Sequence, residues 1–596
     1  MLSPKVTKLM KPETILDKIK PKKVSLSRQL FLRPYLLEGI IVALLVVATI
    51  LINYKMIKDG INGKVDLKWH LTWIQHFSKQ LSEGIWYPRW LAGTNYGYGS
   101  PTFVFYPPFV YYLGSFLKLS GLNTQDVVIT LFSLALFLSG FTFYLYGRNQ
   151  WGRTAALLGG FAYMTVPYIA FDIYWRGGLA SVFVQAWIPL LWWSTDQSLS
   201  EKKWRFTLPM SWTLIALTHT PSLLVCAIVW FPYVLFSILN RPWKAVVKTI
   251  ISAGIGWGIA SFYLLPAILE KRFVNIEVMR GIWGGAAANL LNFRDIFTNI
   301  DKNQIVYIFS HQALVVLLLM IIAFVIYRYQ SNITKKIQPW LVFILALVFI
   351  MSSFSEFIWN MSPTLQMLQF PWRFLQIFSF VGAVVFAIVV QGLLQLPLTP
   401  RFLLSTVIIG ILFFNFSYSY KLSRKYVTLR NPGRGSIEHL SHIVTILEDP
   451  YTNKLRDVEE YRPILNEDPS SPPIPLQDQP KIAVVSGEAK FQIEEWKSYY
   501  RKFTVTAEKS SKLQIRLYYY PAWHLYINQK SYPIKMSKDG SIELQLDSGL
   551  YNVELRYQWT LAFTIGVIVS FLSFATLIFF NRNVGRSPHI LKQESI

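Results

Sequence analysis

Long apolar runs recur along most of the chain and constrain its fold more than any other feature. We interpret about twelve of these runs as membrane-spanning helices. They lie at residues 35–54, 125–146, 154–173, 181–195, 206–219, 222–239, 245–268, 312–328, 338–354, 372–392, 402–420 and 558–580. Because 53% of the residues are hydrophobic and only 15% are charged, a single soluble core cannot bury so much apolar surface. The sequence therefore predicts a polytopic α-helical membrane protein.

The distribution of positive charge predicts its orientation. The formal charge is +25, and residues 1–34 hold nine Lys or Arg residues directly before the first apolar run. A basic arm in that position is typical of a cytoplasmic anchor and also suits anionic lipid, so we exclude nucleic acid as a partner. No small-residue cleavage pattern follows the first run, which we interpret as a retained signal anchor.

Residues 103–119 form a thirteenth apolar candidate. The pair Pro107-Pro108 interrupts helical hydrogen bonding early in this run. If the run lies on the membrane surface, the basic loops all fall on the cytoplasmic side, as the positive-inside rule requires. We therefore predict a surface-lying helix within an outer loop at 55–124.

The composition changes after the eleventh run. Residues 421–480 are polar and rich in proline toward their end, which is typical of a linker. Residues 481–556 alternate between apolar and polar side chains in short runs separated by turns, a pattern that predicts a small extracytoplasmic β-sandwich. The expected organisation is an arm at 1–34, a membrane domain at 35–420, a linker at 421–480, a sandwich at 481–556, and a last span with a cytoplasmic tail at 557–596.

Asp66 and His70 are the first candidate site residues. Positions i and i+4 share one face of a helix, so this pair can hold a divalent cation such as Mg²⁺ or Mn²⁺, or the imidazole can orient Asp66 as a base. An exposed pair at a helix start is the alternative. The first outer loop has no D-x-D motif, and Cys226 is the only cysteine, so the sequence predicts no cysteine-based metal site and leaves metal dependence open.

Three arginines and one histidine lie at predicted membrane boundaries. A charge near the membrane interior costs about 2.5–3.5 kcal/mol on insertion scales, so such a guanidinium usually has a partner. Phosphate suits Arg373, Arg176 and, less clearly, Arg89, whereas snorkelling to lipid headgroups is the alternative. Asp172 is expected to pair with Arg176. His219 can contact a substrate hydroxyl or phosphate, or simply pack at the end of a span.

Several motifs resemble those of the polytopic GT-C glycosyltransferases. They are D-L-K-W-H (66–70), Y-P-R-W (87–90), G-Y-G-S-P-T-F-V-F-Y-P-P-F (97–109), Y-W-R-G-G-L-A (174–180), F-P-W-R-F (370–374) and the late Y-Y-P-A-W-H-L-Y-I-N. More closely, the chain resembles the bacterial membrane proteins labelled 6-pyruvoyl-tetrahydropterin synthase-related. That label concerns a membrane domain and implies no pterin chemistry here.

The resemblance implies an inverting transfer of sugar on the outer face of the cytoplasmic membrane. The donor would be a polyprenyl-phosphate-linked sugar, and the acceptor a glycan, lipid or protein. It assigns the catalytic carboxylate to Asp66. We assign substrate positioning to His70 and His219, and phosphate contacts to Arg373, Arg176 and, less clearly, Arg89. Relatives often carry an acid after Y-x-R-G-x-L-A, where this chain has Ser181.

Two other classes of function fit the same features. A transporter or flippase for lipid-linked glycans also needs many spans and interfacial arginines, but it does not need an Asp–His pair on an outer loop. A non-catalytic GT-C scaffold in envelope polysaccharide assembly is the third possibility. Asp66→Asn distinguishes these classes from an enzyme.

Overall fold

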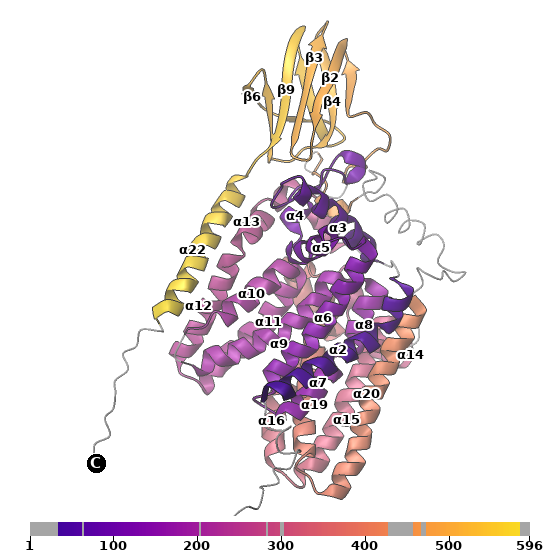
Figure 1. Ribbon diagram of the computed structural model, residues 1–596, viewed down its shortest axis with the longest axis vertical. Coiled ribbons are helices and arrows are strands. Elements are labelled where there is room, and N and C mark those ends of the chain that lie inside the picture. Colours follow the sequence, from indigo (N-terminus) through magenta and orange to yellow (C-terminus); the bar gives the residue numbers. More distant parts are fainter. Residues whose placement is uncertain are drawn as a thin grey trace, which may run out of the picture.

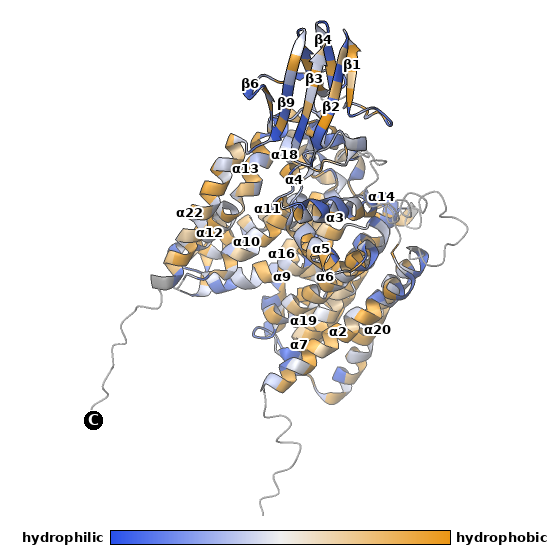
Figure 2. Ribbon diagram, turned by 45° about the horizontal axis from the view of Figure 1, so that its top comes forward, coloured by the Kyte–Doolittle hydropathy of each residue, from blue (hydrophilic) through white to orange (hydrophobic). Residues whose placement is uncertain are grey.

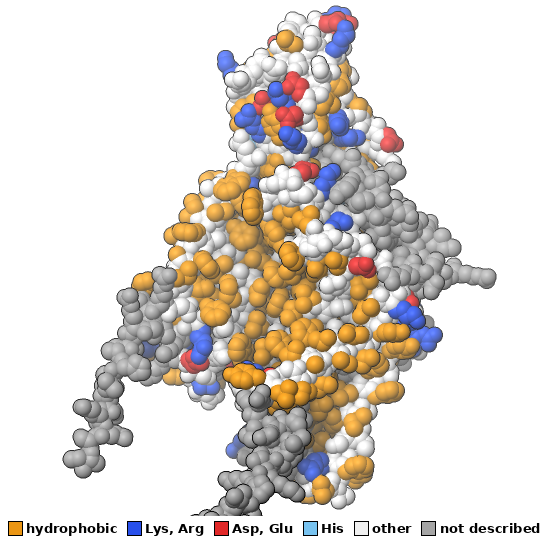
Figure 3. All heavy atoms as spheres, in the orientation of Figure 1, with side chains coloured by type: hydrophobic (Ala, Val, Ile, Leu, Met, Phe, Trp, Pro, Cys, Tyr) orange, Lys and Arg blue, Asp and Glu red, His pale blue; other side chains and the backbone are white. Residues whose placement is uncertain are grey.

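A helical bundle carries a β-sandwich at one end of the molecule (Figure 1). The structure is a computed structural model that describes residues 34–61, 65–201, 204–281, 284–298, 303–426, 457–465 and 472–583. Nearly all of the predicted basic arm and much of the predicted linker lie outside these residues. The bundle helices consist largely of hydrophobic residues (Figure 2). On the face that Figure 3 shows, hydrophobic side chains cover much of the bundle, and many charged side chains lie on the sandwich.

Nine helices in the described part of the chain are long and apolar enough to cross a membrane, or ten if one bent pair counts as a span. The bundle comprises α2 (Pro34–Asp59), α6 (Thr124–Gly147), α7 (Arg153–Met164), α8 (Pro167–Phe171), α9 (Leu179–Ser200), α10 (Thr207–Thr218), α11 (Thr220–Phe236), α12 (Trp243–Ile259), α13 (Ser261–Leu269), α15 (Gln304–Tyr327), α16 (Asn332–Met351), α19 (Leu375–Leu393), α20 (Leu398–Tyr426) and α22 (Leu561–Asn583). The expected count of about twelve is therefore not confirmed.

The difference arises in the predicted runs 181–195, 206–219 and 245–268. Helix α10 has 12 residues, and at about 1.5 Å per residue it is too short for a hydrocarbon core of roughly 30 Å. Helix α9 is long enough, but Trp, Gln, Ser and Thr side chains reduce its hydropathy. The third run folds as α12 and α13, which meet at 76°.

Helix α19 is the centre of the bundle. In the most apolar part of the span that contains α19, 89% of the residues are buried. The buried share is 22% for α2 and 17% for α22. Helices α7, α15 and α16 pack around it. The short helix η9 (Pro371–Phe374) directly precedes α19, so the end of the central helix nearer the sandwich lies beside the candidate site residue Arg373.

The outer loop folds into short helices that lie between the bundle and the sandwich. These are α3 (Leu67–Ser82), α4 (Thr102–Phe105) and α5 (Phe109–Leu119). Pro107-Pro108 separates α4 from α5, and the 11 residues of α5 cannot cross a bilayer. The apolar run 103–119 is thus two short helices rather than a span, as its prolines predicted.

The sandwich has two antiparallel sheets of order β1-β4-β8-β7 and β2-β3-β9-β5-β6. The strands are β1 (Ile482–Ser486), β2 (Ala489–Trp496), β3 (Tyr500–Ala507), β4 (Ser511–Tyr518), β5 (Trp523–Ile527), β6 (Lys530–Tyr532), β7 (Lys535–Met536), β8 (Ser541–Leu546) and β9 (Gly549–Tyr557). These limits match the predicted domain at 481–556. Alternate residues of β3, β4 and β5 face the core.

The outer loop completes the apolar core of the sandwich. The buried Trp90 ring lies 5.9 Å from the Trp523 ring and 6.1 Å from the Tyr557 ring. Gly99 permits this packing, because a Cβ there would lie 2.4 Å from Trp90 Nε1 and its φ is +80°. Tyr518 N donates to Tyr98 O over 2.9 Å. The sandwich and the outer loop are therefore one packed body.

Replacing Trp90 with alanine should destabilise this body by about 3–5 kcal/mol, since it removes a large buried aromatic side chain. Trp86, which is 88% exposed, is the matched control and should change stability by less than about 0.5 kcal/mol. Thermal unfolding of both purified variants measures the difference. Equal shifts would show that the packing of Trp90 does not contribute to stability.

Candidate functional site

Asp66 precedes α3 and is held by an arginine from another part of the chain. Its Oδ2 lies 2.9 Å from Arg176 Nε, and its backbone N–H donates to Arg176 O over 2.9 Å. The carboxylate makes no capping hydrogen bond to α3, and its side chain is 32% exposed. Asp66 therefore presents a fixed carboxylate that solvent or a substrate can reach.

The turn between α8 and α9 explains how Arg176 reaches Asp66. Residues Asp172–Arg176 form η2, a π-helical turn, and Gly177 follows it with a φ of +70°. A Cβ on Gly177 would lie 2.6 Å from Leu67 Cβ, so only glycine allows the turn to approach α3 this closely. π-Helical turns are rare and occur often at functional sites.

Arg176 also pairs with Asp172, as the sequence predicted. Arg176 Nη1 lies 3.3 Å from Asp172 Oδ1, and Asp172 is fully buried. Ser181 Oγ donates to Asp172 Oδ2 over 2.8 Å. One guanidinium thus lies between two carboxylates, and the acid that contacts Ser181 is Asp172. Arg176 therefore already pairs with two carboxylates, and its expected contact with phosphate stays a prediction.

Arg373 is a buried cation without a carboxylate partner among the described residues. Its side chain is 4% exposed, and its Nη2 donates to Gln369 Oε1 over 3.2 Å. Its Nε and Nη1 are buried without a hydrogen-bond partner in the described part of the chain. Because a buried charge is costly when it is unpaired, these open donors indicate an anion-binding position.

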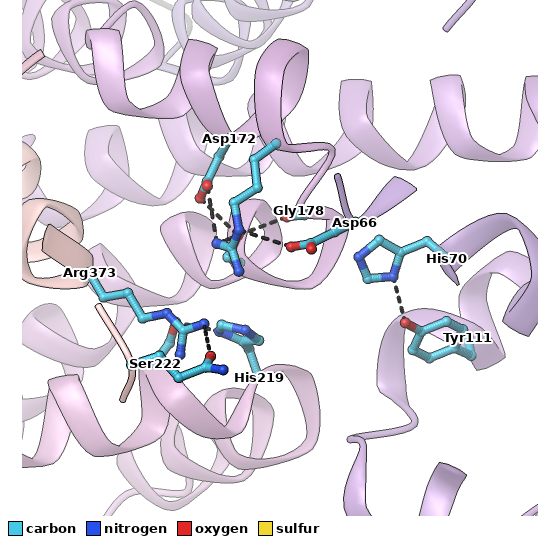
Figure 4. Close-up of polar contacts among 11 residues, drawn as sticks. Asp66, His70, Tyr111, Asp172, Gly178, His219, Ser222 and Arg373 are labelled. Atoms are coloured by element: carbon cyan, nitrogen blue, oxygen red, sulfur yellow. Dashed lines mark hydrogen bonds and ion pairs between the residues drawn. The ribbon is translucent and has the colours of Figure 1, made fainter. Parts of the chain in front are cut away.

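His219 lies next to Arg373 in the break between α10 and α11 (Figure 4). Its Nδ1 lies 2.7 Å from Ser222 Oγ, and that hydroxyl donates its proton to Gln376 Oε1 over 2.7 Å. The serine oxygen must then accept from His219, which assigns the proton to Nδ1. His219 Nε2 is therefore left as an acceptor for a hydroxyl. The positive charges of Arg373 and Arg176 both act on this ring.

His70 is close to Asp66 in sequence but has a different partner. Its Nδ1 lies 2.6 Å from Tyr111 Oη, and the ring is 2% exposed. Burial lowers the pKa of His70 to about 4; the charge of Arg176 lowers it as well, whereas Asp66 opposes the shift. The imidazole is thus neutral at pH 7. Arg176, not His70, sets the orientation of Asp66.

Tyr106 and Asp457 also contribute to this region, although the sequence analysis named neither as a site residue. The charges of Asp66, Arg176 and Arg373 all act on Tyr106. The ring of Trp73 packs 4.7 Å from Tyr106, and its Nε1 donates to Asp457 Oδ1 over 2.9 Å. Tyr106 directly precedes the two prolines and was recognisable by that position. Asp457 had no local signal, because it lies 384 residues from Trp73.

Arg89 is not part of this cluster. Its guanidinium lies 3.8 Å from the Phe563 ring of α22 and 5.3 Å from the Tyr557 ring of β9, and the side chain is 2% exposed. Such stacking stabilises a junction between domains. The Nη1 of Arg89 is buried without a hydrogen-bond partner among the described residues, so its assignment to phosphate binding stays a prediction. The cluster, which we call the Asp66 cluster, consists of Asp66, His70, Tyr106, Asp172, Arg176, His219 and Arg373.

The described residues contain no group of three or more His, Cys, Asp or Glu side chains that could hold a metal ion. Asp66 pairs with Arg176, and His70 uses its Nδ1 for Tyr111. A divalent cation remains an expectation from the sequence.

Comparison with known proteins places the chain in a family. A family model described as "6-pyruvoyl-tetrahydropterin synthase related domain; membrane protein" matches residues 103–423. Comparison with curated proteins gives no match. Among solved structures, the crystal structure of ArnT from Cupriavidus metallidurans bound to undecaprenyl phosphate matches with a TM-score of 0.38 and 11% identity, over 70% of this chain and 76% of that chain. The family match covers more than half of the 596 residues, so the chain belongs to the family of 6-pyruvoyl-tetrahydropterin synthase-related membrane proteins.

Proposed function

We propose that this protein is a GT-C-type glycosyltransferase. It moves a sugar from a polyprenyl-phosphate carrier to an acceptor hydroxyl on a glycan, lipid or protein, with inversion at the anomeric carbon. The observation that carries the proposal is the Asp66 cluster, in which a reachable carboxylate and a buried guanidinium with open donors share one region at the membrane boundary. A base and an anion site are the two groups that this displacement needs.

Asp66 is the base of the proposed reaction. As the acceptor oxygen attacks the anomeric carbon, the hydroxyl proton passes to Asp66, and the bond from that carbon to the phosphate oxygen breaks. The electron pair leaves with the polyprenyl phosphate, and Arg373 Nε and Nη1 donate to the charge that develops there. His219 Nε2 accepts from a sugar or acceptor hydroxyl. Arg176 holds the carboxylate in place.

The distribution of basic residues supports an extracytoplasmic site. Arg148, just after α6, and Arg153, the first residue of α7, both pair with Glu38 of α2. Arg328 follows α15. These helix ends lie at the end of the bundle away from the sandwich (Figure 1). Because cytoplasmic loops are enriched in Lys and Arg, that end faces the cytoplasm in our proposal. The Asp66 cluster and the sandwich then lie on the outer side of a bacterial cytoplasmic membrane.

A non-catalytic scaffold or a transporter for lipid-linked glycans is the second candidate. The observation that favours it is Ser181, a neutral residue where relatives often carry an acid. In the structure Asp172 makes the contact with Ser181, but both Asp172 and Asp66 pair with the same arginine. An assay of sugar transfer distinguishes this candidate from an enzyme, because only an enzyme consumes the donor.

Asp66→Asn should lower the rate of sugar transfer by about 10²–10⁴-fold, since the amide cannot accept the hydroxyl proton. The assay uses the purified protein with a panel of sugars on undecaprenyl phosphate. Glu83→Gln, an exposed change at the other end of α3, is the matched control and should keep the wild-type rate. An Asp66→Asn protein as active as wild type would refute the catalytic role. Transport without donor consumption would support the second candidate.

Arg373→Gln should weaken binding of polyprenyl phosphate by about 10–100-fold, because it removes a charge-assisted contact worth roughly 1.5–3 kcal/mol. It should not lower the unfolding temperature, since the guanidinium is buried without a carboxylate partner in the described residues. Arg89→Gln is the control and should show the opposite pattern, with normal binding and lower stability. Thermal shift with and without undecaprenyl phosphate measures both properties. Unchanged affinity in Arg373→Gln would remove the anion site from the proposal.

His70 should make the stability of the protein depend on pH. Its folded pKa of about 4 lies below the unfolded value of about 6.5, so the unfolded state binds the proton first. The contribution of His70 to the free energy of unfolding is therefore fully present above pH 6.5. It is lost as the pH drops toward 4, by about 3 kcal/mol at most. Burial lowers the pKa of His76 to about 4 as well, so His70→Gln should remove only part of the dependence. Thermal unfolding at pH 5.0 and 7.5 tests this, and an unchanged slope in His70→Gln contradicts it.

A further inference from the structure

Gln369 lies between the buried guanidinium of Arg373 and an outer loop. Its Oε1 accepts from Arg373 Nη2 over 3.2 Å, and its Nε2 donates to Met279 O over 3.1 Å. Because a guanidinium only donates and a carbonyl only accepts, these partners fix the orientation of the amide. The side chain is 6% exposed. One buried amide therefore connects the candidate anion site to the loop.

The loop at residues 270–281 is held on its other side by the sandwich and the chain that leads to it. Asn275 Nδ2 donates to Pro463 O over 2.7 Å. Glu270 accepts a hydrogen bond from Tyr520 Oη, between β4 and β5. The carbonyl that accepts from the buried amide thus belongs to an anchored segment, and the amide in turn has a fixed support.

The backbone of Gln369 is unusual for this residue type. Its φ is +61°, in the left-handed region that a residue with a Cβ seldom adopts. The next residue, Phe370, is extended, as expected directly before Pro371, and its ring lies 5.2 Å from the guanidinium of Arg373. Residues in sparsely populated conformations persist where their surroundings determine them, and they cluster at ligand clamps. The two hydrogen bonds of the amide are contacts that favour this conformation.

The neutral amide has a specific consequence for Arg373. A carboxylate at the same place would pair with the guanidinium and neutralise it, and it could not donate to Met279 O. An aliphatic side chain would leave Arg373 Nη2 without its acceptor. Glutamine holds the guanidinium and leaves its positive charge uncompensated. Arg373 Nε and Nη1 are buried without a hydrogen-bond partner in the described part of the chain, so that charge is available to an anion.

We propose that Gln369 is a positioning residue of the anion site. Its amide holds Arg373 against the loop at 270–281 and leaves the positive charge of Arg373 for the phosphate of the donor. This inference rests on the proposed function, in which the anion is the phosphate of the polyprenyl carrier. It concerns the affinity for that phosphate and not the transfer of a proton to Asp66.

Gln369→Glu tests the proposal, with the purified full-length protein and undecaprenyl phosphate as the probe. The substitution keeps the length of the side chain and supplies a carboxylate to Arg373. The affinity for undecaprenyl phosphate, measured by equilibrium titration, should fall by about 10–100-fold, because the guanidinium is neutralised. A merely structural role predicts a lower unfolding temperature with unchanged affinity.

Gln366→Glu is the matched control. Gln366 lies three residues earlier, and its Nε2 also donates to a backbone carbonyl, that of Trp359, over 3.2 Å. The control therefore loses the same kind of bond and gains the same charge without supplying a partner to Arg373. It should bind undecaprenyl phosphate as wild type does. Gln369→Glu should lower the unfolding temperature by no more than the control, since its carboxylate gains a matched buried cation.

An Arg373→Gln background shows whether Gln369 acts through Arg373. In that background, Gln369→Glu should not lower the affinity further, because the charge that it neutralises is absent. If Gln369→Glu does not fold, Gln369→Met has a similar length and provides neither a strong donor nor a strong acceptor. It should lower the affinity by about threefold to tenfold, because Arg373 keeps its charge but must be ordered on binding.

The results separate this inference from the function on which it rests. Wild-type affinity in Gln369→Glu together with weak binding in Arg373→Gln would overturn the role of Gln369 and leave the anion site intact. Additive losses in the double variant would overturn it as well, since Gln369 would then act independently of Arg373. Wild-type affinity in both single variants would overturn the anion site itself.

Discussion

The ion pairs of Arg176 with Asp66 and Asp172 join three parts of the chain on which the candidate site depends. Asp66 begins the outer loop, Asp172 ends α8, and Arg176 precedes α9. A guanidinium buried in this way is stable only when its charge is matched and its donors are used. Two carboxylates meet that condition, and the reachable one, Asp66, is consequently fixed relative to the bundle.

Arg176 and Arg373 are both buried, but they are matched differently. Arg176 has two carboxylate partners, whereas Arg373 has the amide of Gln369 and the ring of Phe370, 5.2 Å from its guanidinium, and no carboxylate among the described residues. The first arginine is therefore already neutralised, and the second has donors to offer to an anion. In our proposal, this difference in partners gives Arg176 a positioning role and Arg373 a role in binding an anion.

The sequence predicted the features that depend on local pattern. Apolar runs located most of the bundle helices, and period-two alternation located the sandwich almost to the residue. The pattern could not predict the length of α10, because an apolar run does not show where a helix ends within it. It also could not place Arg89, since its aromatic partner Phe563 lies more than 470 residues later in the chain. The contact of Arg176 with Asp66 depends on the close approach at Gly177, which is a property of tertiary packing.

The buried carboxylate of Asp457 connects the site to the sandwich. Residues 457–465 fall in the region that composition assigned to a linker, yet Asp457 accepts from Trp73 and from Thr102 Oγ1, the latter over 2.6 Å. Arg462 Nη1 then donates to Pro473 O over 3.3 Å, nine residues before β1 begins at Ile482. Burial raises the pKa of Asp457, and its hydrogen bonds oppose that shift.

Because Trp73 packs against Tyr106 and His70, the chain that enters the sandwich also supports the wall of the Asp66 cluster. The sandwich is thus coupled to the site through side chains at hydrogen-bond distance, and a change that loosens one should be felt by the other.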